Sequence, residues 1–334
     1  MADLSSLGAC TASVWTRAAA LRLLTDSQIE ALLYDGTWTR VLPGIYADGG
    51  FTLSPVQWAF AAALASGLPD GEPERGSPVS AFRAVPCART AARVWGIPLI
   101  DDDDPAVEAL DRVNHDVAVW TRLAPLTYDD SGGAVHRRRL EMRGQDLVRH
   151  GSGLWLSSRE RTLFDLTRFV SFHALVCAID HQLRHGAVSR ADLEQLARDL
   201  KRKRGAATFA RAVALADERA ESPAETIGRL LLLPVLPGLR PQVLLLDAGA
   251  RQVARFDLGD EELRLAFETD GKAGHQGSAM AAKDHARDRR TSALGWHTER
   301  ATWFELRRRP DEVVRRVVAA AEALRAGGRS LNAR

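Results

Sequence analysis

The clearest alternation of apolar and polar residues lies near the C-terminal end of the chain. Residues 263–270 read Leu-Arg-Leu-Ala-Phe-Glu-Thr-Asp and pass from apolar to acidic. In a strand, residues two apart share a face, so Leu265 and Phe267 would point one way and Glu268 and Asp270 the other. The pattern predicts a strand that buries one face and carries two carboxylates on the other.

A second strand and a helix are predicted just before this segment. The apolar run 253–258 contains Asp257 near its end. Upstream, Ser-Pro-Ala-Glu at 222–225 has the form of a helix start with Pro at the first position, and apolar residues follow at 227–233. Glu225 is therefore expected in the first turn of a long helix.

The first fifty residues predict two short helices followed by a hairpin. We expect helices over 17–24 and 27–34, with Thr16 and Ser27 as capping residues. β-type runs at 38–42 and 45–47 flank a Pro-Gly turn. Helix, turn, helix and hairpin is the order of a winged helix.

Between these ends the pattern is mixed. Short alternating runs and helices in 51–156 predict an α/β middle region, and 157–220 predicts a helical connector, with Ser157 and Glu160 at capping-box spacing. With a module at 1–50 and a last domain at 221–334, we expect an α/β protein, α+β overall, whose C-terminal domain is a mixed sheet flanked by helices.

Composition excludes some classes of protein. The 334 residues are 46% hydrophobic and 26% charged with a net charge of +2, which is ordinary for a soluble protein and does not by itself indicate nucleic acid. Three scattered cysteines argue against a disulfide framework. No long apolar segment predicts a membrane span or a signal peptide, so we expect a cytoplasmic protein without membrane contact.

Two carboxylates side by side repel each other and lose solvation when buried. They are tolerated when a hard cation takes their oxygens. The acidic side chains of the two predicted strands therefore indicate a site for Mg²⁺ or Mn²⁺. The alternative is a solvated strand end beside the turn at Gly271, which is the common explanation for an isolated acidic pair.

The wider set of residues resembles a nuclease family. A helix Glu (Glu225), a strand Asp (Asp257), Glu-Thr-Asp-Gly at 268–271 followed by His275, Arg-Asp at 287–288 and Gly-Trp at 295–296 resemble the Vsr-like (very short patch repair-like) endonucleases, which have the PD-(D/E)XK fold. The resemblance covers about a quarter of the chain. His275 stands one residue farther from Asp-Gly than in the family's pattern.

The resemblance implies a role for each matching residue. Asp257, Glu268 and Glu225 would bind the metal ion, with Glu225 acting directly or through water, and Asp270 would belong to the same catalytic group. His275 would be the general base or position the water, and Asp288 would orient His275 or Arg287. DNA phosphate would be held by Lys272, Arg287 and Arg289. Trp296 is more typical of a core residue than of a base-stacking one.

The N-terminal module resembles another family. The run Gly-Thr-Trp-Thr-Arg-Val-Leu-Pro-Gly-Ile-Tyr at 36–46 is similar to that of the winged helix in AbiE-type antitoxins. The resemblance implies DNA contact by Ser27 and Gln28 at the start of the second helix and by Arg40 on the wing.

The sequence thus predicts a metal-dependent DNA endonuclease targeted by an N-terminal winged helix. The alternative is an antitoxin-like transcriptional regulator whose nuclease-fold domain is catalytically degenerate. An RNA substrate also stays open, because the chemistry at phosphate is similar. Besides DNA, a second copy of the chain or a toxin-like protein is the expected partner.

Overall fold

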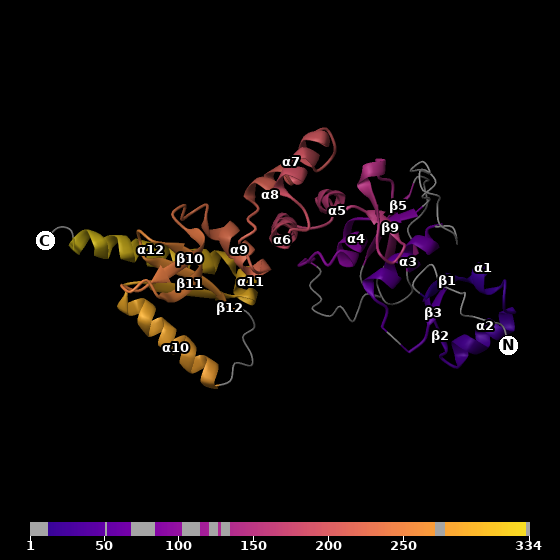
Figure 1. The fold of residues 1–334 in the computed structure, drawn as a ribbon, viewed down its shortest axis with the longest axis horizontal. Helices are drawn as coiled ribbons and strands as arrows, with labels where there is room; N and C mark the ends of the chain where they lie inside the picture. Colours follow the sequence, from indigo (N-terminus) through magenta and orange to yellow (C-terminus); the bar gives the residue numbers. More distant parts are fainter. Residues whose placement is uncertain are drawn as a thin grey trace. The chain divides into compact units, whose positions relative to one another are not determined.

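The computed structural model describes residues 13–50, 52–67, 84–101, 114–119, 126–127, 134–270 and 278–331. Helices and mixed sheets make it an α+β protein, as the sequence predicts (Figure 1). The chain forms two compact units rather than the four segments used above. The first unit comprises Met1–Ala178 and Val188–Arg211, and the second comprises Ile179–Ala187 and Ala212–Arg334.

The first unit begins with the helices and hairpin expected from the sequence, preceded by an additional short strand. The elements are β1 (Val14–Thr16), α1 (Arg17–Ala20), α2 (Asp26–Tyr34), β2 (Trp38–Leu42) and β3 (Ile45–Asp48). The strands form an antiparallel sheet in the order β1-β3-β2. Gly44 has a φ of 73° in the turn of the hairpin, a conformation that favours glycine.

Two local predictions in this region are wrong. Thr25, not Ser27, begins α2: the Thr25 side chain accepts a hydrogen bond from the Gln28 amide, and the Gln28 side chain accepts one from the Thr25 amide. This reciprocal capping box satisfies two backbone donors, which a cap at Ser27 would leave open. Helix α1 ends at Ala20 instead of Leu24, and a turn follows.

The N-terminal sheet shares its core with the residues that follow. Helix α3 (Pro55–Ala65) begins at Ser54, whose side chain and that of Gln57 form another capping box. Trp58 and Phe60 of α3 pack in one apolar cluster with Val14 and Ile45 of the sheet. Residues 13–50 also have a buried cluster of their own, which is formed by Trp15, Ala19, Ala20, Ile29, Trp38 and Tyr46.

A second sheet and a group of helices complete the first unit. The strands β4 (Ala84–Pro86), β5 (His115–Val119), β6 (Leu126–Thr127) and β7 (Ala134–Arg138) form a mixed sheet in the order β4-β5-β7-β6. The other elements are α4 (Ala88–Val94), the 3₁₀ turn Gly144–Asp146, β8 (Leu147–Arg149), β9 (Trp155–Ser157), α5 (Arg159–Leu166), α6 (Phe172–Arg184), α7 (Arg190–Asp199) and α8 (Ala206–Leu215). The last residues of α6 and α8 belong to the second unit.

The predicted helical connector begins with two helices, α5 and α6. Ser158, not Ser157, caps α5 and accepts a hydrogen bond from the Arg161 amide, while Ser157 lies at the end of β9. The break after Leu166 has a local cause, because the Ser171 hydroxyl accepts a hydrogen bond from the Ala174 amide and starts α6 anew.

The second unit is a mixed sheet flanked by helices. Its elements are α9 (Pro223–Leu232), β10 (Arg240–Leu246), β11 (Gln252–Asp260), β12 (Leu265–Asp270), α10 (Ser278–Ala293), β13 (His297–Thr302), α11 (Trp303–Arg308) and α12 (Pro310–Leu331). The order is β10-β11-β12-β13, in which only β12 and β13 are parallel. A parallel pair needs a crossover, and α10 lies in the segment that joins these two strands.

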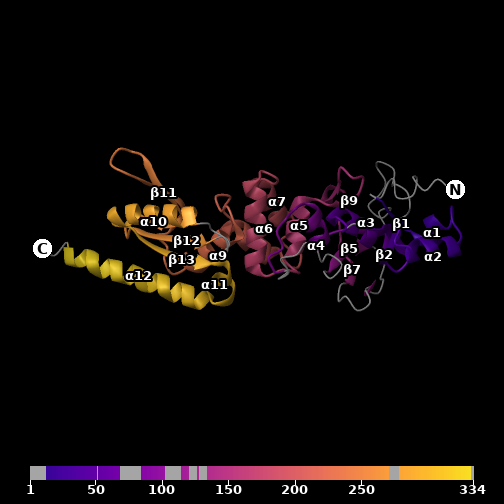
Figure 2. The ribbon, with the colours of Figure 1, turned by 90° about the horizontal axis from the view of Figure 1, so that it is seen from below.

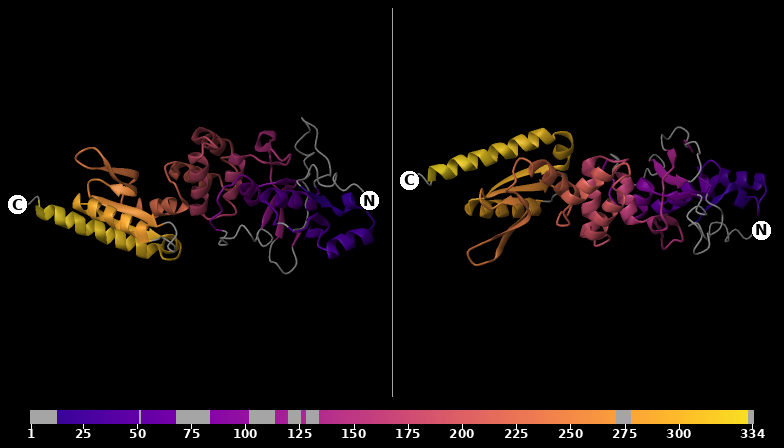
Figure 3. Two further views of the ribbon diagram at one scale, coloured as in Figure 1. Left: turned by 60° about the horizontal axis from the view of Figure 1, so that its bottom comes forward. Right: turned by 90° about the horizontal axis from the view of Figure 1, so that it is seen from above.

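Helices cover both faces of this sheet. Helix α10 lies on one side and α12 on the other (Figure 2), and α12 runs alongside the sheet in two further views (Figure 3). Helix α9 contacts α12, β11 and β12. Although α12 has 22 residues, none of the helices in the described ranges is long and apolar enough to cross a membrane.

Candidate functional site

Asp257 and Glu268 lie on the two central strands of the second unit's sheet. The antiparallel register pairs Leu258 with Phe267, so the next step along both strands brings Asp257 opposite Glu268. Thr269 donates a backbone hydrogen bond of 2.7 Å to Asp257 Oδ2 and holds the two strands together at this point. The two carboxylates are close enough for the charge of Asp257 to raise the pKa of Glu268. Both residues lie on central strands, because β10 and β13 are the edge strands of this sheet.

Glu268 is buried and bonded to two arginines. Its side chain is 9% exposed, and Oε2 accepts hydrogen bonds from Arg287 Nη2 at 2.7 Å and from Arg300 Nη2 at 3.0 Å. Burial raises the pKa of Glu268 because it penalises the charged form, and the two arginines oppose that shift without cancelling it. The site therefore holds a carboxylate whose ionised form depends on its cationic neighbours.

Each of the two central carboxylates keeps one oxygen without a hydrogen-bond donor in the described ranges. Asp257 receives both the amide and the hydroxyl of Thr269 on Oδ2. Glu268 receives both arginines on Oε2. Asp257 Oδ1 and Glu268 Oε1 therefore remain available to a further partner. Carboxylate oxygens are the ligands that hard cations prefer.

Glu225 differs from this pair. It lies in the first turn of α9 behind the N-cap Ser222, as the sequence predicts, and Asp257 contributes to raising its pKa, after burial as the main cause. Both of its oxygens are occupied, Oε1 by the Ser222 hydroxyl and Oε2 by the Glu221 amide and the Gln242 side chain. Glu225 thus lies within the electrostatic influence of Asp257 but has no open oxygen of its own.

No group of three His, Cys, Asp or Glu side chains that could hold a metal ion exists among the residues the structure describes. This finding does not conflict with a Mg²⁺ site at Asp257 and Glu268. Mg²⁺ keeps several of its waters and is usually bound through one or two carboxylates together with substrate phosphates. The two open oxygens fit such an ion chemically.

Arg300 is the residue of this site that sequence reasoning missed. In the parallel register of β12 and β13 it stands opposite Glu268. Its guanidinium group bonds Glu268 and also binds both oxygens of Asp288, at 2.6 and 3.0 Å. Asp288 therefore orients Arg300, which was not among its expected partners Arg287 and His275. His275 lies outside the described residues. The sequence alone could not pair the two residues, because only the register of β12 and β13 brings Arg300 to Glu268.

The remaining candidates of the second unit lie in several places. Asp270 is exposed at the end of β12, and Arg289 is exposed on α10. Lys272 and His275 lie outside the described residues. Trp296 is buried and packs its ring 4.9 Å from that of Phe256, so its expected core role is confirmed.

The N-terminal candidates lie on the expected elements. Ser27 is exposed in the first turn of α2, and Arg40 is exposed on β2, opposite Tyr46 of β3. The side-chain oxygen of Gln28 is held by the Thr25 cap. Gln28 could accept a hydrogen bond from a base only by weakening this capping bond, although its Nε2 amide can still donate one, so Ser27 and Arg40 are the better placed of the three.

Comparison with known proteins identifies two relatives and no family. No family model matches the chain. It is 25% identical over 308 residues to two uncharacterized proteins of Mycobacterium tuberculosis, MT2308 of strain CDC 1551 / Oshkosh and Rv2248 of strain ATCC 25618 / H37Rv. Each alignment covers 91% of this chain and 100% of the relative. The similarity therefore extends across both units.

Proposed function

We propose that this chain is a cytoplasmic, metal-dependent DNA endonuclease whose reaction takes place at Asp257 and Glu268. The observation that carries the proposal is the pairing of these carboxylates on adjacent central strands, each with one oxygen left open. Arg287 and Arg300 add two positive charges beside the pair. Phosphodiester hydrolysis needs this combination, in which carboxylate oxygens bind a cation and neighbouring guanidinium groups bind the phosphate.

In this proposal the open oxygens of Asp257 and Glu268 hold Mg²⁺ or Mn²⁺. When bound, the ion would neutralise charge on the phosphate and lower the pKa of a water. Arg287 and Arg300 donate hydrogen bonds to the phosphate oxygens. His275 accepts a proton from the water that attacks phosphorus, and the bond from phosphorus to the leaving oxygen breaks. Glu225 stabilises the arrangement through the capping bonds that fix the start of α9.

The direct test is Mg²⁺- or Mn²⁺-dependent cleavage of plasmid, single-stranded and mismatched DNA by the full chain. Asp257→Asn and Glu268→Gln remove the charge of a ligand and should abolish cleavage. Glu262→Gln is the matched control, because Glu262 is an exposed carboxylate in the turn between the same two strands. Cleavage by Asp257→Asn at the wild-type rate would refute the assigned site.

The second candidate is an antitoxin-like regulator that binds DNA and does not cut it. The observation that favours it is the double ion pair on Glu268, which neutralises this carboxylate within the protein. A wild-type chain that cleaves none of the three DNA substrates with either metal, but binds its own promoter, would establish this function instead. RNA belongs in the same assay as a fourth substrate.

DNA contact by the N-terminal elements is part of both proposals. Ser27 and Arg40 are exposed on α2 and β2, the elements that a winged helix uses for the groove and the wing. Lys272 and Arg289 would add phosphate contacts in the second unit. A homodimer or a complex with a toxin-like protein is the proposed assembly, which size-exclusion chromatography with light scattering would test.

A further inference from the structure

A cavity of about 200 Å³ lies in the first unit beside α5. Its charged lining consists of four cations and one carboxylate: Arg139, Arg161, Arg168, Lys203 and Glu141. Leu140, Phe164 and Leu200 supply apolar surface. None of the residues assigned above to metal or DNA binding lines this cavity.

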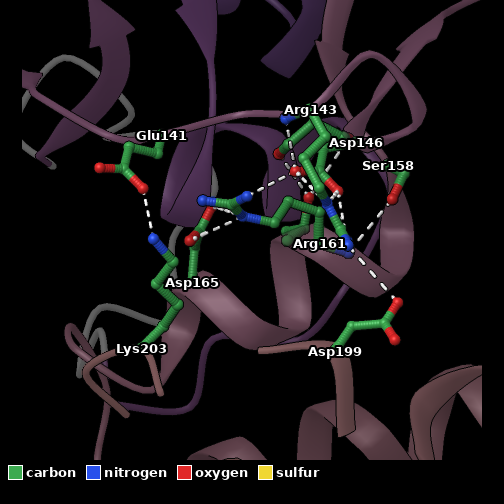
Figure 4. Close-up of polar contacts among 10 residues, drawn as sticks. Glu141, Arg143, Asp146, Ser158, Arg161, Asp165, Asp199 and Lys203 are labelled. Atoms are coloured by element: carbon green, nitrogen blue, oxygen red, sulfur yellow. Dashed lines mark hydrogen bonds and ion pairs between the residues drawn. The ribbon is translucent and has the colours of Figure 1, made fainter. Parts of the chain in front are cut away.

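The most informative lining residue is Arg161, a buried cation with an unused donor group. It is 5% exposed, its Nε donates to both oxygens of Asp165 at 3.1 Å, and its Nη1 donates to Asp146 Oδ2 at 2.6 Å. The remaining nitrogen, Nη2, has no partner among the described residues. In Figure 4 this nitrogen carries no dashed line and points to the side where Glu141 and Lys203 lie. This nitrogen is not one of the fully buried atoms that lack a partner, so it is open to the cavity and can donate to an acceptor there.

The charges around the cavity leave an excess of cations at its rim. Arg161 forms ion pairs with Asp146 and Asp165, and Glu141 forms an ion pair with Lys203. The side chains of Arg139 and Arg168 are exposed and make no hydrogen bond or ion pair within the described ranges, although Arg139 acts on Glu141 and Arg168 on Asp165 through their charges. The rim therefore presents two guanidinium groups with free donors in addition to the free nitrogen of Arg161.

We propose that this cavity binds a phosphate monoester. A phosphate monoester offers three acceptor oxygens, which suits several guanidinium donors better than the two oxygens of a carboxylate. Guanidinium groups also bond phosphate oxygens in pairs with favourable geometry. The apolar surface beside the cations accommodates the group that carries the phosphate. The ligand is either a free mononucleotide or the 5′-phosphate end of a nucleic acid. This inference is independent of the nuclease proposal, because all residues involved belong to the first unit.

Calorimetric titration of the full chain tests the proposal with AMP, adenosine and inorganic phosphate. AMP and phosphate should bind and adenosine should not, because the phosphate carries the interaction. A short 5′-phosphorylated oligonucleotide and its unphosphorylated form distinguish the sources. Tighter binding of the phosphorylated oligonucleotide than of AMP assigns the site to nucleic-acid ends, and the reverse assigns it to the free nucleotide.

Variants decide whether binding occurs in this cavity. Arg139→Ala and Arg168→Ala remove exposed side chains without protein partners, so both variants should fold. Each should weaken AMP binding at least about tenfold, since a charge-assisted hydrogen bond is lost. Lys201→Ala is the control: Lys201 is an exposed cation two residues from Lys203 that does not line the cavity. No binding of AMP or phosphate, equal binding of adenosine, or equal weakening by the control would overturn the proposal.

Discussion

Glu268 and Arg300 face each other across parallel strands, and the Arg300 guanidinium group holds Glu268 and Asp288 at once. Arg300 therefore links β12, which carries the candidate ligand, to α10, which supplies Asp288 and Arg287. An arginine with a second carboxylate to fix its orientation can keep Glu268 ionised and still offer donors to a phosphate. In the proposed mechanism Arg300 therefore has two roles, to keep Glu268 ionised and to bind the phosphate.

Replacing Arg300 should shift the pH dependence of cleavage. Arg300 lowers the pKa of Glu268 against the effect of burial, so Arg300→Ala should raise that pKa further. The proposed metal ligand is the ionised form of Glu268. As the pH is lowered, the variant should therefore lose activity at a higher pH than the wild type does. A pH profile of the cleavage rate with saturating Mg²⁺ measures the shift of this acidic limb.

The control for this prediction is Arg289→Ala. Arg289 is an exposed arginine of α10 without a bond to Glu268, so its replacement should leave the acidic limb in place. An Arg300→Ala enzyme that is slower but has the wild-type acidic limb would show that Arg300 does not control the ionisation of Glu268.

Gly228 sets the distance between α9 and the strand that carries Glu268. A Cβ atom at Gly228 would stand 2.7 Å from Cε1 of the buried Phe267. Gly228→Ala should therefore destabilise the fold by about 1–3 kcal/mol through overpacking, although alanine is the better helix former. Urea unfolding followed by circular dichroism measures the difference in free energy of unfolding.

The matched control is Gly327→Ala in α12. Gly327 is exposed, and a Cβ atom there would meet nothing within 4 Å. Alanine should stabilise this helix by about 0.5–1 kcal/mol, since only the propensity changes. If the two substitutions change stability in the same direction, the close approach of α9 to β12 is not what Gly228 provides.

The sequence predicted the elements around the candidate site because their signals are local. Ser222 and Pro223 mark the start of α9, and the alternation in 263–270 marks β12, so Glu225 and Glu268 are found where they were expected. The partners of Glu268 could not be predicted in the same way. Arg300 lies thirty-two positions away and reaches Glu268 only through the parallel register of the two strands.

Cap positions were also difficult to predict where two candidates lie close together. Thr25 and Ser27, like Ser157 and Ser158, are both good N-caps by residue type. The rejected candidates Ser27 and Ser157 also have a Glu three positions later, so the capping-box spacing alone does not decide between the candidates. The capped helices were thus predicted, and their caps were displaced by two residues in α2 and by one in α5.

Asp165 should make the stability of the chain depend on pH. Burial raises its pKa to about 6, against the opposing effect of Arg161. An unfolded Asp has a pKa of about 3.9, so between these values the folded state binds the proton more tightly. The contribution of Asp165 to stability therefore increases as the pH falls from 7 to 5, by about 1 kcal/mol.

Urea unfolding at pH 7 and pH 5 for the wild type and Asp165→Asn isolates this contribution. The variant lacks the titrating group, so its stability should gain about 1 kcal/mol less than that of the wild type over the same interval. Identical gains in the two proteins would show that Asp165 stays ionised throughout, held by Arg161.

Arg40 should contribute a phosphate contact if the N-terminal elements bind DNA. It is exposed on β2, and the sheet to which it belongs shares a core with α3, so the experiment requires the full chain. Binding to a duplex from its own promoter, measured by fluorescence anisotropy, should weaken steeply with added salt because phosphate contacts release counterions. Arg40→Ala should weaken binding to all sequences and reduce the slope of log K against log salt by about 1.

Lys201→Ala provides the control, as an exposed cation of the same unit outside the N-terminal elements. Binding that is insensitive to salt, or an unchanged slope in Arg40→Ala, would assign the hairpin to a protein partner instead of DNA.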